Sequence, residues 1–116
     1  MTPDALKKRT KQFGLRVIRL VESLPKTKTA STIGGQLLRC GTSVGANYSA
    51  ACRGRSKAEF IAKLGVVEEE ADESAYWIEM LVEAEIIKIG SVKELHTEAD
   101  ELTAIMAKSR QTARRK

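Results

Sequence analysis

Apolar side chains recur at alternating spacings of four and three residues along four stretches of the chain. That spacing places them on one face of an α-helix, as in the core of a helical bundle. The pattern therefore predicts an all-α protein, an antiparallel up-down four-helix bundle. The predicted helices extend from Pro3 or Asp4 to Leu24, from a cap at Thr29, Ser31 or Thr32 to Arg53, from Ser56 to Lys88, and from Ser91 to Met106.

The same spacing predicts which side chains are buried. Most of the expected core positions are aliphatic or small, but Asn47 stands where an apolar residue is expected. A polar residue at such a position usually fixes the register of the helices. The expected core consists of Leu6, Thr10, Phe13, Val17, Leu20 and Leu24, then Ile33, Leu37, Cys40, Val44, Asn47 and Ala51, then Phe60, Leu64, Val67, Ala71, Ser74, Ile78 and Leu81, and finally Val92, Leu95, Ala99, Leu102 and Met106.

Turn residues mark the points where the predicted helices end and begin. Pro25 ends the first helix, because it lacks a backbone N–H and restricts the residue before it. Gly54, which lies between two arginines, indicates a tight turn, and Ser56 followed by Glu59 has the pattern of a capping box. Gly90 is expected to close the third helix, and the next residue is expected to open the fourth.

The second and third predicted helices have contrasting side chains. The second is rich in small residues, and each glycine costs about 1 kcal/mol relative to Ala in a helix, which predicts close helix–helix contact. The third carries a run of carboxylates between positions 68 and 73. Two interpretations of this run are open, a solvated acidic face or a half-buried polar network. The network would join Asn47 and either Arg39 or Arg53 to one or more of Glu69, Asp72 and Glu73.

A long run in the middle of the chain is specific enough to indicate a family. Through QLLRCGTSV and SVGANYSAACRGRSKAEFIAKLGVVEEEADESAYWIEML, the chain resembles the bacterial four-helix-bundle proteins encoded within intervening sequences of 23S ribosomal RNA genes, also called S23 ribosomal proteins. The resemblance implies an antiparallel four-helix bundle that assembles as a homopentamer. In the commoner branch of the family an acidic-Gly pair comes soon after the Asn, whereas here Ala50-Ala51-Cys52 follows, so no role of that acidic residue carries over.

The resemblance also bears on partners. An accessory protein of diversity-generating retroelements is similar in its bundle and pentameric barrel, and it binds nucleic acid. This similarity implies RNA or another nucleic acid as a ligand, and an RNA-processing enzyme or a reverse transcriptase as a protein partner. Tyr76, Trp77, Met80 and Ile87 give the third helix more apolar surface than one core needs, which fits either a subunit interface or ordinary core packing.

The 116 residues suffice for one domain with a single core. Residues 1–107 form the predicted bundle, and residues 108–116, which lack an apolar pattern, form an expected basic, flexible C-terminal tail. Residues 1–63 carry 13 Lys and Arg against 3 Asp and Glu, residues 64–105 carry 2 against 12, and residues 106–116 carry 5 against none. Basic and acidic helices are therefore expected to pair within the bundle, whereas the tail has no internal partner.

The two cysteines, Cys40 and Cys52, fall on one predicted helix. At 1.5 Å per residue they lie about 18 Å apart, which is too far for a disulfide, so two free thiols are expected. Free thiols suit a reducing cytoplasm. No apolar stretch has the length or position of a secretory signal or a membrane span, so the sequence predicts a cytoplasmic protein without a membrane partner.

Patterns for catalysis and metal binding are missing from the sequence. His96 is the single histidine, so the Glu-x-x-His pairs of di-metal helical bundles do not occur. The Gly34-Gly35 pair does not precede the Gly-Lys-Ser/Thr of a phosphate-binding loop. The sequence therefore predicts a protein that is not an enzyme and that uses no metal or cofactor.

Basic residues near both ends of the chain suit contact with a nucleic-acid backbone, because Lys and Arg neutralise phosphates without reading base sequence. The sequence has no recognition-helix motif and no set of aromatic residues arranged for stacking. We therefore expect sequence-independent RNA binding, with a protein-interaction scaffold as the alternative. A third interpretation is that the lysines only keep the bundle in solution. The expected nucleic-acid contacts are Lys7, Lys8, Lys11, Arg110, Arg114, Arg115 and Lys116.

Overall fold

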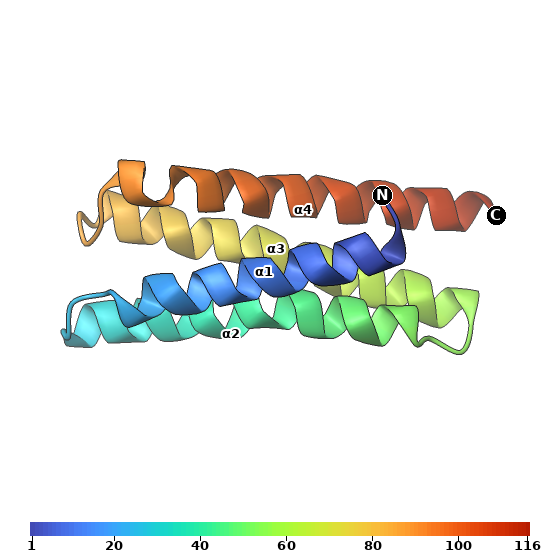
Figure 1. Ribbon diagram of the computed structural model, residues 1–116, viewed down its shortest axis with the longest axis horizontal. Helices are drawn as coiled ribbons and strands as arrows, with labels where there is room; N and C mark the ends of the chain where they lie inside the picture. Colours follow the sequence, from blue (N-terminus) through green and yellow to red (C-terminus); the bar gives the residue numbers. More distant parts are fainter.

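Four α-helices connected by short turns make up the computed structural model, which describes residues 1–116. Consecutive helices run in opposite directions and form an elongated bundle of 47 × 20 × 19 Å (Figure 1). The prediction of an all-α four-helix bundle is confirmed, and no strand is present. The helices are α1 (Pro3–Glu22), α2 (Lys28–Cys52), α3 (Lys57–Glu83) and α4 (Ile89–Arg115).

The helices pack in chain order, with α1 against α2, α2 against α3 and α3 against α4. The remaining side of the bundle, between α1 and α4, is packed much less closely. Both chain ends and the α2–α3 turn lie at one end of the bundle, and the other two connections lie at the opposite end (Figure 1). None of the four helices combines the length and the apolar character needed to cross a membrane.

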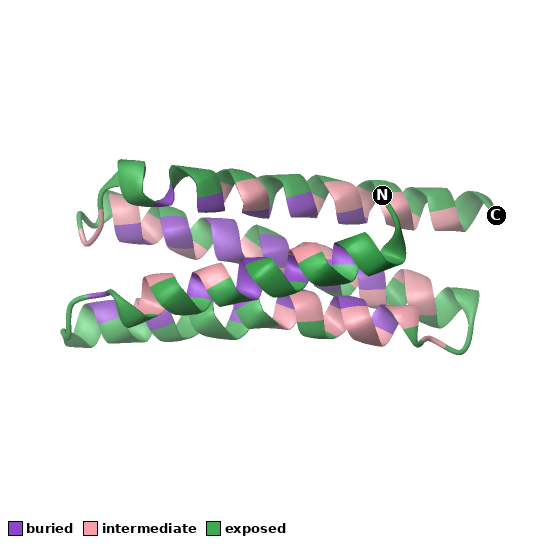
Figure 2. Cartoon of the chain, viewed as in Figure 1, coloured by how far each residue is buried: buried purple, intermediate pink, exposed green.

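One core of 21 buried apolar residues extends along the bundle, and exposed residues cover the outer faces (Figure 2). The predicted stripe of α4 is buried throughout, and so is that of α3 from Leu64 to Leu81. In α1 and α2 the predicted stripes are buried except at Leu20, Ile33 and Asn47. Phe13 and Leu102 are 0% exposed, and burial of such side chains contributes about 1.5–3 kcal/mol each.

Asn47 lies outside the core, contrary to the prediction. Its side chain is half-buried, and its amide donates to the carbonyl oxygen of Ser43 in the same helix at 2.9 Å. The core position belongs instead to Tyr48, which is only 4% exposed. Helical spacing permits either residue, since they follow Val44 by three and four positions. The ring of Tyr48 fills the core, because burying an amide without a partner is costly.

α1 and α2 approach each other closely where α2 lacks side chains. A Cβ atom at Gly41 would lie 2.8 Å from both Cγ atoms of Val17. A Cβ atom at Gly45 would lie 3.3 Å from the backbone of Thr10. The prediction that small residues of this helix serve close helix contact is therefore confirmed.

Hydroxyl side chains cap the N-termini of three helices. Thr2, Thr27 and Ser56 each accept a hydrogen bond from the backbone N–H three residues later. The predicted cap at Ser56 and the turn at Gly54 are confirmed. α2 begins earlier than predicted, because Ala30 in its first turn is buried in the core. The residues predicted to cap this helix lie inside its first two turns, namely Thr29, Ser31 and Thr32.

α3 ends several residues before Gly90, the predicted stop. Glu85 adopts the left-handed conformation with a φ of 60°, and the N–H of Ile86 donates to the carbonyl oxygen of Leu81 at 2.9 Å. This arrangement is a Schellman motif, which ends the helix without a glycine. Ile86 packs against the core, so an apolar contact favours the early end. Gly90 and Ser91 lie in the first turn of α4, whose N-terminus has no side-chain cap.

α4 continues through Arg115, whereas the sequence predicted a bundle ending at residue 107 and a flexible tail over residues 108–116. The last two turns of α4, over residues 108–115, contact other helices. Arg110 contacts Glu68 and lies against Gly65 of α3, and Ala113 lines a cleft with the ends of α2 and α3. Residues 108–115 therefore belong to the helix, which does not end near residue 107 as predicted. The sequence did not indicate this, because an ion pair and small-residue contacts leave no apolar periodicity.

Candidate nucleic-acid interface

Basic residues from both chain ends and from the α2–α3 turn gather at one end of the bundle. In Figure 1 this is the end where α1 begins, α4 ends and α2 turns into α3. Pro3, Lys57 and Lys116 come from these three segments and line a single cleft. We refer to residues 3–11, 53–63 and 108–116 together as the basic end.

The charge of the basic end is one-sided. It carries 13 Lys and Arg against 2 Asp and Glu, whereas the remaining residues carry 7 against 13. The sequence shows positive charge in three separate segments, and the fold brings these segments together. A surface with so strong an excess of one sign attracts polyanions.

Most of these basic side chains are free of internal partners. Eleven of the 13 have no carboxylate oxygen within 4 Å. Six of the seven predicted nucleic-acid contacts belong to this free set, and all six are exposed. They are Lys7, Lys8, Lys11, Arg114, Arg115 and Lys116.

Arg110, the seventh predicted contact, is held by the bundle. Its Nη2 lies 2.6 Å from a carboxylate oxygen of Glu68, and both side chains are half-buried. Arg9 is the other paired residue of the basic end. Its Nε and Nη2 each donate to Glu98 at 2.7 Å, and this bonding raises the pKa of Arg9. The Glu68 partner lies 42 residues from Arg110, a separation that local sequence patterns do not reveal.

Three lysines of α1 border a shallow groove of about 490 Å³ between α1 and α2. Gly14 and Gly45 contribute to its lining, and their missing side chains keep it smooth. Leu15 and Ile18 continue the groove along α1 as partly exposed apolar residues. The groove therefore combines an apolar surface with cations at its edge. The three lysines are Lys7, Lys8 and Lys11.

The predicted polar network forms in part, and it forms at the surface. Nη2 of Arg39 lies 2.6 Å from Glu73, and Nη1 lies 3.4 Å from Glu70. Trp77 donates its indole N–H to the same Glu73 carboxylate at 3.0 Å. The pairing of Arg39 with Glu73 is confirmed, but the expected burial is wrong, since the Arg39 side chain is 52% exposed.

The pKa values of the two carboxylates beside Arg39 are shifted in opposite directions. The hydrogen bond from Trp77, followed by that from Arg39, lowers the pKa of Glu73. Burial raises the pKa of Glu70, because loss of hydration disfavours its charge more than Arg39 favours it. Arg39 therefore stabilises the charge of Glu73 more than that of Glu70.

The other predicted members take no part in this network. Arg53, Glu69 and Asp72 are exposed and have no ion-pair partner. Asn47 bonds only within its own helix. Asp72 comes one residue before Glu73, about 100° around the helix axis, and therefore points away from α2 when Glu73 faces it. Glu69 lies one turn before Glu73, but its side chain is exposed and is not paired with Arg39. Glu70 was not in the predicted set.

Both thiols are free, as predicted, and both lie on α2. Cys40 is buried, and Ser74 of α3 donates its hydroxyl to the Cys40 sulfur at 3.3 Å. Burial raises the pKa of Cys40, so its thiol stays neutral. Cys52 is half-buried near the basic end. The two thiols therefore differ in accessibility.

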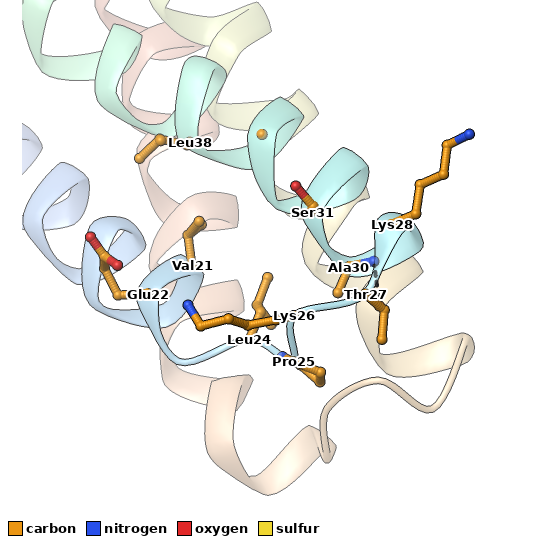
Figure 3. Close-up of a pocket in the computed structure, with 11 residues that line it drawn as sticks. Val21, Glu22, Leu24, Pro25, Lys26, Thr27, Lys28, Ala30, Ser31 and Leu38 are labelled. Atoms are coloured by element: carbon orange, nitrogen blue, oxygen red, sulfur yellow. Dashed lines mark hydrogen bonds between the residues drawn. The ribbon is translucent and has the colours of Figure 1, made fainter.

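Other surface features offer less concentrated chemistry. The cleft in Figure 3 has a volume of about 590 Å³, lies at the α1–α2 connection, and is lined by Glu22, Lys26 and Lys28 beside apolar groups. His96 lies on α4 with its Nε2 2.6 Å from Glu79. No three His, Cys, Asp or Glu side chains are grouped so as to hold a metal ion.

Sequence reasoning missed one feature of the basic end, a cleft among the helix ends. Its volume is about 660 Å³, and its lining includes Tyr48, Cys52 and Phe60. Tyr48 and Cys52 lie four residues apart, and therefore on one side of α2. The sequence therefore indicated that Tyr48 and Cys52 lie together, but the place of Phe60 in the cleft lining depends on how α3 packs against α2.

Comparison with known proteins agrees with this architecture. Residues 5–108 match the family of the 23S rRNA-intervening sequence protein. The fold is similar to the crystal structure of a protein of unknown function from the S23 ribosomal protein family of Bacteroides thetaiotaomicron, with a TM-score of 0.88 and 29% identity over 96% of this chain and 99% of that chain. No protein with a curated description matches significantly. The resemblance inferred from the sequence is confirmed, and the chain belongs to the 23S rRNA-intervening sequence protein family.

Proposed function

We propose that this protein is a non-enzymatic bundle whose basic end binds the backbone of structured RNA or another nucleic acid. The supporting observation is the collection of eleven Lys and Arg side chains without carboxylate partners at one end of the molecule. Lys and Arg bind phosphates without base preference and gain affinity by releasing counterions. The remaining surface is net negative, so it repels the same backbone and orients the basic end toward it.

The lysines of α1 suit contact with an extended backbone. Lys7 and Lys11 are one helical turn apart, or about 6 Å along the axis, and therefore share a face. Lys8 lies beside them at the same groove. A phosphate backbone that follows α1 would meet several cations in succession, and the cations at the end of α4 extend the same charged surface.

We further propose that the bundle assembles as a homopentamer, as the family resemblance implies. Exposed apolar side chains are available for subunit contact, namely Leu15 and Ile18 on α1 and Tyr76 on α3. A ring would present five basic ends together and raise the avidity for one nucleic acid. Light scattering should return five times the chain mass of 12.8 kDa, and a monomer at micromolar concentration would contradict the assembly.

The protein partner on this proposal is an RNA-processing enzyme or a reverse transcriptase. The basic end supplies charge and shape rather than a nucleophile or a metal site, so chemistry on the bound nucleic acid would belong to that partner. The two free thiols suit the reducing cytoplasm, which is where we place the protein.

Fluorescence anisotropy of a labelled RNA hairpin between about 50 and 200 mM salt tests the proposal. Binding through phosphates should weaken steeply, with a slope of log K against log salt of about −0.7 to −0.9 for each phosphate neutralised. Affinity that does not change over this range, or no binding at all, would contradict it.

A protein-interaction scaffold is the alternative function. The observation that favours it is the smooth groove between α1 and α2, with Leu15 and Ile18 partly exposed beside it. An apolar contact of this kind would be insensitive to salt, because burial of apolar surface does not depend on charge screening. Salt-insensitive capture of one protein partner, together with absence of RNA binding, would favour the scaffold.

A further inference from the structure

The cleft among the helix ends lies within the basic end and has a volume of about 660 Å³. It is lined by residues from the start of α1, the end of α2, the start of α3 and the end of α4. Its volume falls within the range of about 300–1,000 Å³ that is usual for ligand pockets in proteins. Backbone contact through exposed lysines does not require such a cleft.

Tyr48 lines this cleft, and its hydroxyl meets the Cys52 thiol but makes no hydrogen bond of normal length and angle to any oxygen or nitrogen of the protein. The residue is 4% exposed, yet every fully enclosed side-chain oxygen or nitrogen of the protein has a partner. The Tyr48 oxygen is therefore accessible from the cleft. Burial raises the pKa of Tyr48, and a hydrogen bond to the neighbouring Cys52 thiol raises it further. The phenol therefore stays protonated and can exchange this bond, since sulfur is a weak acceptor, for a bond to a ligand.

The cleft also has an apolar ring, from Phe60, and two cations, Lys57 and Lys116. Phe60 is half-buried in the cleft lining and offers an apolar ring of the kind on which nucleobases stack. Lys57 and Lys116 are exposed members of the same lining, and neither has an ion-pair partner. A matching ligand has a flat ring, a hydrogen-bonding edge and an adjoining phosphate.

We propose that this cleft holds a single unpaired nucleobase of the bound nucleic acid. Tyr48 bonds to the edge of the base, Phe60 contacts its face, and Lys57 and Lys116 bind the phosphate beside it. The inference rests on the proposed nucleic-acid binding and adds a preference for single-stranded ends, loops or bulges. Bases inside a duplex are stacked and paired, so they cannot enter the cleft without being extruded.

Cys52 lines the same cleft and can report on its occupancy. Alkylation by iodoacetamide, followed by mass spectrometry of the intact protein, should modify Cys52 while the buried Cys40 serves as an internal control. A ten-nucleotide single-stranded RNA should slow the alkylation of Cys52 at least about fivefold, since a stacked base excludes the reagent. A blunt duplex of ten base pairs and inorganic phosphate should leave the rate unchanged.

Anisotropy measurements with the same two RNAs separate this inference from the proposed function. If both RNAs bind in a salt-dependent manner and neither slows the alkylation, the base site is overturned while backbone binding stands. Equal protection by both RNAs overturns the base site as well, because a blunt duplex has no free base to insert. If neither RNA binds, both proposals are overturned.

Two substitutions test the roles of individual side chains. Tyr48→Phe removes only the hydroxyl and should weaken single-strand binding about threefold or more, with duplex binding unchanged. Phe60→Leu keeps apolar bulk but removes the ring, and should have at least as large an effect. Ser91→Ala, which removes an exposed hydroxyl outside the cleft at the opposite end of the bundle, is the control and should change neither affinity. Single-strand affinity equal to wild type in both cleft variants, with helicity intact by circular dichroism, would overturn the proposal.

Discussion

Arg110 and Arg114 lie one turn apart on α4, but their surroundings differ. Arg110 contacts Glu68 at 2.6 Å, whereas Arg114 is exposed and has no carboxylate oxygen within 4 Å. The difference arises because α4 extends past the acidic part of α3 to a region with Lys57 and Lys63. The body of the bundle, residues 12–52 and 64–107, supplies every carboxylate that pairs with an arginine.

This contrast separates two uses of positive charge. An arginine within reach of the carboxylates of the body contributes to stability, as Arg9 and Arg110 do. A cation beyond that reach contributes little to stability and stays available to a ligand. Substitutions of paired or packed residues should therefore change the free energy of unfolding, and substitutions of the unpaired cations of the basic end should change affinity for nucleic acid.

Packing between α1 and α2 should give the largest effect on stability. In Gly41→Ala the new methyl carbon would lie 2.8 Å from both Cγ atoms of Val17, so the helices must move apart. Overpacking costs about 1–3 kcal/mol, partly offset by about 1 kcal/mol of helix propensity, and we expect a net loss of up to about 2 kcal/mol in urea denaturation. Gly35→Ala, with nothing within 4 Å, should instead stabilise by up to about 1 kcal/mol. Similar effects of the two substitutions would contradict close contact at Gly41.

The ion pair between Arg9 and Glu98 should come next. Two bonds of 2.7 Å join these side chains, which are 25% and 15% exposed, on the loosely packed side of the bundle. Arg9→Ala should lower the free energy of unfolding by about 1–2 kcal/mol, because it removes charge-assisted hydrogen bonds. Arg53→Ala is the control at the basic end and should change it by less than about 0.5 kcal/mol. If the two variants have the same free energy of unfolding, an ion pair with a carboxylate does not distinguish the stabilising cations from the unpaired ones.

A smaller, pH-dependent effect is expected at Glu73. Its pKa in the folded protein is lowered from 4.5, so its charge contributes stability above that value and loses the contribution as pH falls through the lowered pKa. Glu73→Gln should lose less than about 1 kcal/mol at neutral pH, since the Arg39 pair is solvent-exposed. At a pH below the lowered pKa the loss should disappear, because the wild-type carboxyl is then protonated. A loss of equal size in urea denaturation at both pH values would show that Glu73 acts through packing rather than charge.

The helix phases could be predicted from the sequence because every core position must recur at helical spacing. Val92, Leu95 and Ala99 are buried as that spacing requires, and the cap at Ser56 depends on residues only three positions apart. The choice between Asn47 and Tyr48 could not be made in this way. Helical spacing permits either residue in the core, and the choice between them depends on burial, because an amide is more costly to bury than an aromatic ring.

The candidate site was predictable in composition but not in arrangement. Lys7 and Lys116 were expected to contact phosphates, yet their presence at one end of the bundle follows from how the helices connect. The ion pair of Arg110 depends on a partner 42 residues away, and the cleft of Tyr48 and Phe60 depends on two helices meeting. These features depend on contacts between segments that are far apart in the sequence, and local sequence patterns do not predict such contacts.

The salt dependence of RNA affinity in two variants of equal charge change tests the role of the basic end most directly. The magnitude of the slope should fall by about 0.7–0.9 for each phosphate that is no longer neutralised, or roughly 2–3 for three substitutions at the basic end, and should stay unchanged in the control. Both variants should unfold at the wild-type urea concentration. Slopes that fall equally in the two variants would contradict the claim that binding belongs to the basic end. The first variant replaces Arg114, Arg115 and Lys116 by Ala, and the control replaces the exposed Lys26, Lys88 and Lys93 near the opposite end.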